Sequence, residues 1–305
     1  MKSFISICTA FLVMVAGSKS FAQHQGLTKI MDNVYSYVDI RNAGPGNSFG
    51  ANAGIVIGKD GILVVDTLLT AKEARRFLAD IRKVSDKPVR YVVDTHYHLD
   101  HAFGNSELAK AGGIVISQAA DRKNLELKGE PVLKNMSAFG LSEEDVRGTE
   151  IKLPDLTFTD RMSVSMGGEK IDLIHVGPSH TEGSLLVYLP DRKLLFTGDI
   201  LFSDFHPYMG EGDLAGWIKT LDFILSLDVD TIIPGHGPIS RKKDINLMKE
   251  YLVIFDRKAR ELALKSDNPD IIATELKNAL PARSQGDFLI PSNIREKYLQ
   301  KTAPK

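Results

Sequence analysis

The chain has 305 residues, 43% of them hydrophobic and 25% charged, so it is long enough to bury a substantial core. Its 38 lysine and arginine residues nearly balance its 39 aspartate and glutamate residues. This balance excludes both the strong positive field of a nucleic-acid-binding protein and the composition of a disordered chain. We therefore expect a folded protein without a nucleic-acid partner, and the composition sets no oligomeric state.

The first residues have the pattern of an export signal. Lys2 precedes an apolar run over residues 4–17, and the small residues Ser20 and Ala22 follow it. The run is shorter than the roughly 20 residues that span a bilayer, so a signal peptide over residues 1–22 is favoured over a membrane anchor. We expect a periplasmic or secreted protein without membrane attachment after cleavage. The single cysteine, Cys8, lies in this segment, so the remaining chain has no disulfide or thiolate ligand.

Strands and helices alternate in the next part of the chain. Short β-rich runs bounded by turn residues predict strands over residues 53–58, 61–66, 89–94 and 113–117. A helix is expected over residues 70–85, because Thr70 is suited to the N-cap and Glu73 stands at the capping-box position. Helical sequence over residues 119–127 follows the last of these strands, and an irregular stretch runs from there through Arg147.

The second half is richer in strands and closes with helices. From Ile151 onwards, strands are predicted over residues 170–177, 184–190, 193–199 and 231–233, which implies a second sheet. Amphipathic patterns predict helices over residues 213–227, 241–266 and 269–280. The chain has no internal repeat and no low-complexity linker, so residues 23–305 are interpreted as one domain with C-terminal helices.

The segment "DTHYHLDHAFGN" (residues 94–105) has the highest density of potential metal-binding side chains in the sequence. His96, His98, Asp100 and His101 fall within six positions, directly after the strand over residues 89–94. His96 and His98 share a face of extended backbone, whereas Asp100 and His101 turn toward another face as a helix starts. An isolated histidine is more often a surface or core residue, but this density favours a metal site. Imidazole and carboxylate ligands suit zinc, with iron or manganese as alternatives.

Three further residues follow predicted strands in the second half. His180 lies in "PSHTEG", Asp199 in "TGD" and His236 in "PGHGP". Each motif alone is compatible with an ordinary loop or helix cap. Together, side chains aimed from several strand ends at one point indicate a two-metal site.

The order HxHxDH, Ser-His-Thr, Gly-Asp and Pro-Gly-His-Gly resembles that of metallo-β-lactamase-fold hydrolases, over about residues 33–238. The resemblance implies an α/β fold, a four-layer αββα sandwich, with the site at one edge. It implies two zinc ions per chain, with Asp199 between them. It assigns one ion to His96, His98 and His180, and the other to Asp100, His101 and His236. It also places Asp66, with Thr181, behind the ligands as supporting residues.

The resemblance further implies a reaction with a small-molecule substrate. Two divalent cations lower the pKa of a shared water, and the resulting hydroxide attacks an ester, thioester, lactone or amide carbonyl. Asp100 is the expected catalytic residue, which orients the nucleophile. In the stretch 204–217, His206, Tyr208 and Trp217 are candidates for substrate contact, with core packing as the alternative for Tyr208 and Trp217.

Asp199 narrows the branch of the family. Secreted zinc β-lactamases mostly carry Cys or Ser at this position and many have a Lys a few residues later, whereas "GDILFSD" (residues 198–204) has neither. An Asp bridge is similar to the glyoxalase II and lactonase branch, although Ser184 stands where glyoxalase II usually has a histidine. The alternatives are a β-lactamase, a mononuclear iron sulfur dioxygenase and a non-catalytic metal binder.

Overall fold

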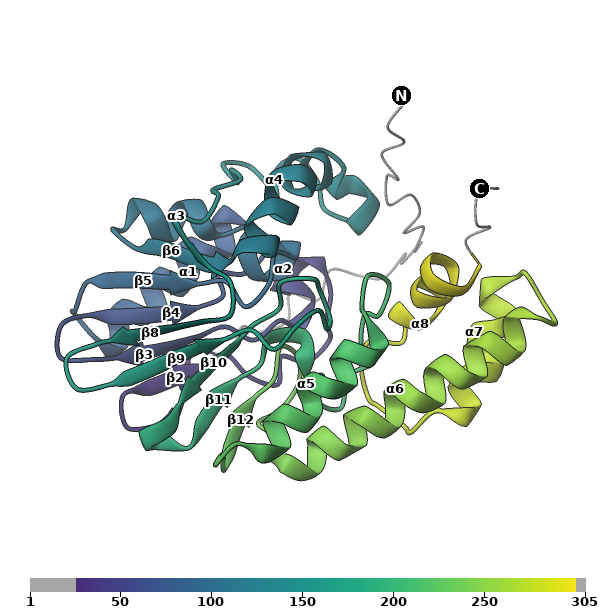
Figure 1. Ribbon diagram of the computed structural model, residues 1–305. Helices are drawn as coiled ribbons and strands as arrows, with labels where there is room; N and C mark the ends of the chain where they lie inside the picture. Colours follow the sequence, from purple (N-terminus) through teal and green to yellow (C-terminus); the bar gives the residue numbers. More distant parts are fainter. Residues whose placement is uncertain (1–25, 300–305) are drawn as a thin grey trace.

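The computed structural model describes residues 26–299 (Figure 1). The expected signal peptide, residues 1–22, lies outside this range and stays a prediction. Among the described residues, no helix combines the length and the apolar character needed to cross a membrane.

The first sheet has seven strands arranged in chain order. Neighbours from β1 to β4 are antiparallel, and neighbours from β4 to β7 are parallel. The parallel part places the C-terminal ends of β4 and β5 at the same edge of the sheet. The strands are β1 (Thr28–Met31), β2 (Val34–Ser36), β3 (Gly54–Ile57), β4 (Ile62–Val65), β5 (Val89–Val93), β6 (Ile114–Gln118) and β7 (Leu156–Phe158).

The second sheet has five strands in the order β12-β11-β10-β9-β8. Its neighbours are antiparallel except for β11 and β12, which run parallel. The C-terminal ends of β11 and β12 therefore also lie at one edge. The strands are β8 (Arg161–Ser165), β9 (Lys170–Ile174), β10 (Leu186–Leu189), β11 (Leu194–Phe196) and β12 (Thr231–Ile233).

Helices connect and cover these strands (Figure 1). They are α1 (Ala71–Val84), α2 (Leu99–Ala102), α3 (Asn105–Lys110), α4 (Ala119–Lys134), α5 (Leu214–Ser226), α6 (Lys242–Ala263), α7 (Pro269–Ala279) and α8 (Leu289–Asn293). A π-helical turn, Ile294–Tyr298, continues α8, and 3-10 turns occur at Pro45–Gly50, Met136–Phe139, Pro190–Arg192 and Gly198–Ile200.

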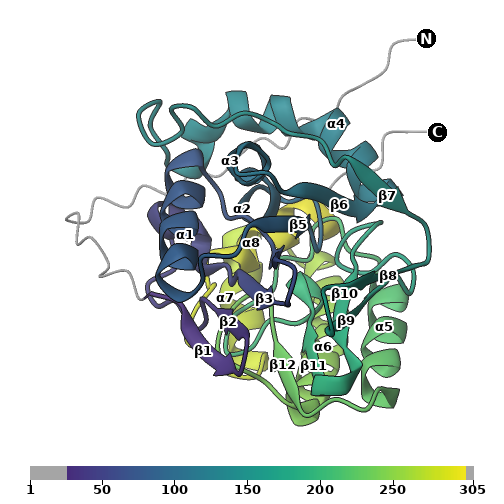
Figure 2. The ribbon, with the colours of Figure 1, turned by 90° about the vertical axis from the view of Figure 1, so that its left-hand side faces the viewer.

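The two sheets pack face to face, and the strand sequences show why. In β4, Leu63 and Val65 point into the space between the sheets, whereas Ile62 and Val64 point to the layer of α1 and α3. In β11, Leu195 points to the layer of α5 and α6. Because successive side chains of a strand alternate between faces, a strand that is buried on both sides reads as a continuous apolar run. Figure 2 shows the sheets between these helical layers, which confirms the αββα sandwich.

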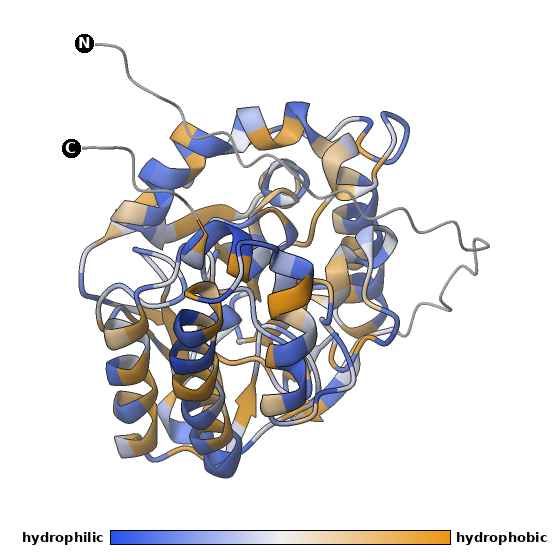
Figure 3. Cartoon of the chain, turned by 90° about the vertical axis from the view of Figure 1, so that its right-hand side faces the viewer, coloured by the Kyte–Doolittle hydropathy of each residue, from blue (hydrophilic) through white to orange (hydrophobic). Residues whose placement is uncertain are grey.

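The covering helices are amphipathic. On α6, Met248, Leu252, Phe255 and Ala259 recur at helical spacing, are fully buried and join the core under the second sheet. Figure 3 shows the resulting alternation of apolar and polar segments along the helices of this side. Each large side chain buried in this way contributes roughly 1.5–3 kcal/mol, so the apolar face fixes α6 to the sheet.

Helix α4 is longer than the sequence pattern predicts. It continues through Gly129 and Pro131 to Lys134, although both residues disfavour a helix interior. In this last part of α4, Val132 packs against the apolar cluster that contains Leu125, as does Ile151 from the segment after the helix. Tertiary packing therefore outweighs the local preference for ending the helix earlier.

Candidate metal centre

Strand β5 delivers four of the predicted site residues. His96 follows the strand directly, and His98 still has extended backbone at φ −60° and ψ 155° as the residue that caps α2. Asp100 and His101 then lie in the single turn of α2. The switch from extended to helical backbone within this segment is the one predicted, and it turns the two pairs of side chains in different directions.

The other three predicted residues come from the second sheet. His180 lies in the loop between β9 and β10, Asp199 in the 3-10 turn after β11, and His236 in the loop after β12. The three side chains are buried, as are His96, Asp100 and His101. The structure thus brings all seven predicted residues to one place, where side chains carried by both sheets meet.

Asp199 stands between two groups of side chains. Its Oδ2 lies 3.7 Å from His96 Nε2 and 3.4 Å from His180 Nε2. Its Oδ1 lies 3.1 Å from His101 Nε2 and 3.4 Å from His236 Nε2. Each carboxylate oxygen therefore faces a different group, which is the arrangement that a bridging ligand requires.

Each group is compact enough to surround one ion. His98 Nδ1 lies 2.9 Å from His180 Nε2, and Asp100 Oδ2 lies 3.3 Å from His236 Nε2. Within each group the potential ligand atoms all lie within 4.8 Å of one another. The groups are His96, His98, His180 and Asp199, and Asp100, His101 and His236.

Unsatisfied atoms test whether a cation fits. His96 Nε2, His101 Nε2 and Asp199 Oδ1 are buried and make no well-aligned hydrogen bond among the described residues, although His101 Nε2 and Asp199 Oδ1 lie 3.1 Å apart. Buried polar atoms are almost always paired, and leaving one unpaired costs about 1–3 kcal/mol. A divalent cation would satisfy the nitrogen lone pairs and the carboxylate at once. The nitrogen and oxygen ligand set, without sulfur, fits zinc and its first-row neighbours.

The charges of the cluster are arranged around the carboxylates. Burial opposes a charge on His101, but Asp199, Asp100 and Asp66 outweigh it and raise the pKa of His101 well above its usual value. Against the same burial penalty, Asp199 and Asp100 raise the pKa of His236 to about 9. In the metal-free protein these imidazolium protons balance the carboxylates, and a bound cation would displace them.

His96 behaves in the opposite way. Burial, together with the nearby charge on His101, lowers the pKa of His96 well below its usual value. Its ring is therefore neutral at neutral pH and offers a lone pair without prior loss of a proton. Neutral imidazole is the form that binds a metal.

Asp66 supports the cluster from behind. Its Oδ2 lies 2.8 Å from His101 Nδ1, while its Oδ1 accepts a 2.7 Å hydrogen bond from the Thr95 amide and its Oδ2 a 2.8 Å bond from the Thr95 hydroxyl. The carboxylate holds the proton of His101 on Nδ1, so Nε2 faces the cluster. Thr181 supports the neighbouring loop, since its hydroxyl donates a 3.0 Å hydrogen bond to Asp121 Oδ1.

Aromatic rings fix the imidazoles of the second sheet. The ring of His236 stacks on Phe202 with centroids 5.1 Å apart and 3° between the planes. Trp217 lies 5.2 Å from the ring of His180. Trp217 itself is buried and donates a 2.8 Å hydrogen bond to the carbonyl of Ile200, so it belongs to the core and packs behind the site.

The structure separates the two weaker candidates for substrate contact. His206 is only 2% exposed, its Nδ1 lies 2.8 Å from the hydroxyl of Tyr251, and its Nε2 lies 3.1 Å from Asp287 Oδ1. The structure thus encloses His206 among protein groups and places it apart from the two groups of candidate ligands, and its contact with a substrate stays a prediction. Tyr208 is half-buried, and its ring centroid lies 5.5 Å from that of His98 and 6.1 Å from that of His180.

Three residues beside His98 were not predicted from the sequence. Glu211 Oε2 lies 3.7 Å from His98 Nε2, and Glu211 accepts hydrogen bonds from the hydroxyl of Tyr97 and, at 2.8 Å, from Lys128 Nζ. Burial favours the neutral acid, but these neighbours outweigh it and lower the pKa of Glu211 well below its usual value. No sequence motif connects Lys128 with Glu211, because they meet only through the fold.

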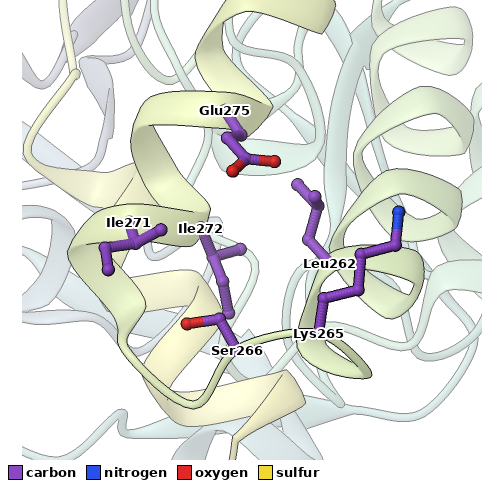
Figure 4. A pocket seen from close by; sticks show the side chains of 6 residues that line it. All are labelled: Leu262, Lys265, Ser266, Ile271, Ile272 and Glu275. Carbon is purple, nitrogen blue, oxygen red and sulfur yellow. The ribbon is translucent and has the colours of Figure 1, made fainter.

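A surface hollow elsewhere does not belong to this cluster. It has a volume of about 280 Å³, and Figure 4 shows it between the end of α6 and the start of α7. Its lining is Leu262, Lys265, Ser266, Ile271, Ile272 and Glu275, none of which is a potential metal ligand identified above. The hollow is therefore separate from the cluster at the strand ends.

Comparison with known proteins agrees with the fold and the motifs. Residues 46–236 match the family described as the metallo-beta-lactamase superfamily. Over 219 residues, 61% of this chain, the sequence is 29% identical to a linear primary-alkylsulfatase from a Pseudomonas species. The match covers only 41% of that alkylsulfatase, so the chain spans less than half the length of this relative.

Two further comparisons cover more of the chain. The sequence is 25% identical over 244 residues to the metallo-beta-lactamase type 2 of Bacteroides fragilis, which covers 77% of this chain and 88% of that enzyme. The solved structure of the stereoselective inverting sec-alkylsulfatase Pisa1 from a Pseudomonas species matches with a TM-score of 0.67 at 20% identity. That match covers 90% of this chain and 50% of the alkylsulfatase, and it shows a likeness of fold.

Proposed function

The chain belongs to the metallo-beta-lactamase superfamily, and from this membership and the geometry of its cluster we propose that it is a dinuclear, zinc-dependent hydrolase. The proposed substrate is a small molecule with an ester, thioester, lactone or amide carbonyl. The single observation that carries the proposal is the position of Asp199, whose two carboxylate oxygens face the two groups of ligands separately. Such a shared carboxylate is suited to two ions and not to one.

When bound, two divalent ions would supply a water of lowered pKa and positive charge for a developing oxyanion. The side chains of this protein hold the remaining parts in place. Asp66 fixes the tautomer of His101, and Phe202 fixes the plane of His236. Asp100 Oδ2 lies 3.3 Å from His236 Nε2 and 3.6 Å from His101 Nε2, and this position supports a role for its carboxylate beside the attacking water. It would orient the attacking water and receive its proton.

The printed names of the relatives add candidate substrates to those with a carbonyl group. One is named an alkylsulfatase and another a metallo-beta-lactamase, so the scaffold is shared by proteins with different printed activities. The similarity to the Bacteroides fragilis enzyme over 77% of this chain supports β-lactam hydrolysis as a second candidate. Sulfate esters belong in any substrate screen for the same reason.

Metal analysis is the first test. Protein purified without added metal and then loaded with zinc is expected to hold about two zinc ions per chain by elemental analysis. A single tightly bound iron would instead support the mononuclear oxygenase, and it would contradict the dinuclear proposal.

A hydrolysis screen is the second test. Aryl esters, thioesters, lactones, β-lactams and alkyl sulfates are compared for the wild type and for Asp100→Asn, which keeps the size of the side chain and removes its charge. We expect turnover of at least one carbonyl class by the wild type, reduced about 100-fold or more in the variant. Metal content is measured in both proteins, so that loss of an ion is distinguished from loss of the carboxylate. Equal rates for the two proteins, or no turnover of any class by the zinc-loaded wild type, would contradict the proposal.

A further inference from the structure

The loop between β11 and α5 is held by the C-terminal segment. Asn293 in α8 is fully buried. Its Oδ1 accepts a 2.6 Å hydrogen bond from the amide of Met209, and its Nδ2 donates a 2.8 Å hydrogen bond to the carbonyl of Pro207. These two backbone groups lie on either side of Tyr208. One side chain therefore fixes the peptide groups that flank the aromatic residue at the metal cluster.

The hydroxyl of Tyr208 is held by the same segment. It donates a 2.5 Å hydrogen bond to Glu296 Oε2, and Ser292 donates a 2.8 Å hydrogen bond to the other carboxylate oxygen of Glu296. Lys297 donates to the carbonyl of Gly212 further along the loop. The backbone and the far end of Tyr208 are thus both set by residues 292–297, which lie outside the part of the chain that matches the family.

Gly210 shows how closely the two segments approach. A Cβ atom at this position would lie 2.4 Å from Glu296 Oε2 and 2.5 Å from the hydroxyl oxygen of Tyr208. Such distances are far below van der Waals contact, so a side chain at position 210 would displace the Glu296 carboxylate and the Tyr208 hydroxyl. This close contact leaves Tyr208 little room to change its position while the C-terminal segment is in place.

The ring of Tyr208 faces the group of ligands that contains His98. It makes edge-to-face contacts with the rings of His98 and His180, at interplanar angles of 73° and 75°. On the other side of the loop, Glu211 is anchored to Lys128 of α4 at 2.8 Å. The loop is therefore fixed from α8 and from α4, with the aromatic ring between these anchors and beside the cluster.

We propose that Asn293 is a positioning residue that holds the ring of Tyr208 as an apolar wall of the substrate site. The inference rests on the proposed function and deepens it. The single proton of the Tyr208 hydroxyl is donated to Glu296, so the residue presents ring surface, and not a hydrogen-bond donor, to a substrate. The substrate class that fits is an ester-type compound with an apolar group next to the attacked carbonyl. The C-terminal helix, outside the matched family region, thereby sets the selectivity of the site.

The test compares Asn293→Ala with Ile290→Val. Ile290 is also buried in α8, and it packs in the core below the second sheet. Removing the Asn293 amide is expected to speed hydrogen exchange of the Met209 amide by about tenfold or more, because that amide loses its acceptor. In a series of aryl esters with acyl groups of increasing size, KM is expected to rise about five- to tenfold for the substrate preferred by the wild type, with kcat changed less than about twofold. The preference for one acyl size should flatten, while Ile290→Val keeps the wild-type profile.

A double-mutant cycle assigns the effect to Tyr208. Tyr208→Ala should raise KM as Asn293→Ala does, and the double variant should be no worse than Tyr208→Ala alone, since both changes remove the same wall. Additive effects of the two substitutions on KM would overturn the inference. Unchanged KM and selectivity in Tyr208→Ala would also overturn it, and this result can be obtained even when Asn293→Ala fails to fold. Hydrogen exchange does not require turnover. If the wild type is inactive but exchange is faster in Asn293→Ala, the proposed function is contradicted and the holding of the Tyr208 loop by Asn293 is supported. Unchanged exchange would overturn this role of Asn293 whatever the activity.

Discussion

The substitution Asp66→Asn tests whether the residue behind His101 controls metal binding. Asp66 accepts three hydrogen bonds, from the amide and hydroxyl of Thr95 and from His101 Nδ1, at 2.7–2.8 Å. Asparagine has nearly the same shape, and it tolerates the positive φ of 61° at this position. The backbone should therefore stay in place while the charge is removed and one acceptor oxygen becomes a donor.

The expected magnitude follows from these contacts. If the new amide group turns its NH2 toward His101, the ring must accept at Nδ1 and carry its proton on Nε2, which then cannot bind a metal. If it turns the other way, the Thr95 amide faces a donor. A charge-assisted hydrogen bond contributes about 1.5–3 kcal/mol, and we expect the metal-free protein to lose roughly this amount. Changes to residues behind a ligand reduce metal affinity about 10- to 100-fold, and we expect a loss in this range.

A competition titration with a zinc-binding chromophore measures the affinity, and denaturant unfolding of the metal-free protein measures the stability. Asp94→Asn is the matched control, since Asp94 is also buried, directly precedes Thr95 and accepts a 2.8 Å hydrogen bond from Asn105. Burial raises the pKa of both carboxyl groups, and the two sites differ in that Asp94 accepts a hydrogen bond from Asn105 whereas Asp66 contacts His101. Wild-type zinc affinity in Asp66→Asn, or an equal loss in Asp94→Asn, would refute the reasoning.

Three other results are expected. Gly235→Ala should abolish zinc binding, because the new Cβ would lie 2.0 Å from Asp199 Oδ1 and 2.6–2.7 Å from backbone atoms of Gly198 and Asp199, so the turn that carries Asp199 must shift. Metal content measures the loss and circular dichroism reports how far the fold is kept; full zinc content would contradict the prediction. Removal of zinc by a chelator should lower Tm, since a ligand at about 1,000 times its Kd stabilises a folded protein by about 4 kcal/mol. Calorimetry that shows the same Tm with and without zinc would exclude a zinc site in the folded state. Burial lowers the pKa of His206 from 6.5 to about 4, so the unfolded chain takes up a proton between these pH values and the folded protein does not. Stability should therefore fall as the pH is lowered through this window, less so in His206→Asn, and identical pH profiles in denaturant unfolding would show that His206 is not the cause.

Local pattern predicted which side chains would gather at the strand ends. The segment from His96 to His101 follows a buried strand, and the backbone change from strand to α2 can be read from the spacing of its residues. Asp199 and His236 likewise stand just after apolar strands. Such residues are placed by the elements that carry them, so their positions depend little on distant parts of the chain.

Residues placed by distant partners could not be predicted in the same way. His206 was expected to face the substrate, but its surroundings are set by Tyr251 and Asp287, which lie in later segments. Lys128 and Glu211 meet only because α4 and the loop before α5 approach the same histidine. No spacing in the sequence records these encounters, since they depend on the packing of whole elements.

The division of the ligands between the two sheets has a consequence for the order of folding. Residues 96–101 follow a strand of the first sheet, whereas His180, Asp199 and His236 follow strands of the second. Neither half of the chain can assemble the cluster alone. The long segment between the two halves must form a closed loop before residues from both sheets can bind an ion together. We therefore expect the proposed ions to bind late, after the sheets have met. Zinc should then slow unfolding much more than it speeds refolding, so its main benefit to the protein is a longer lifetime of the native state.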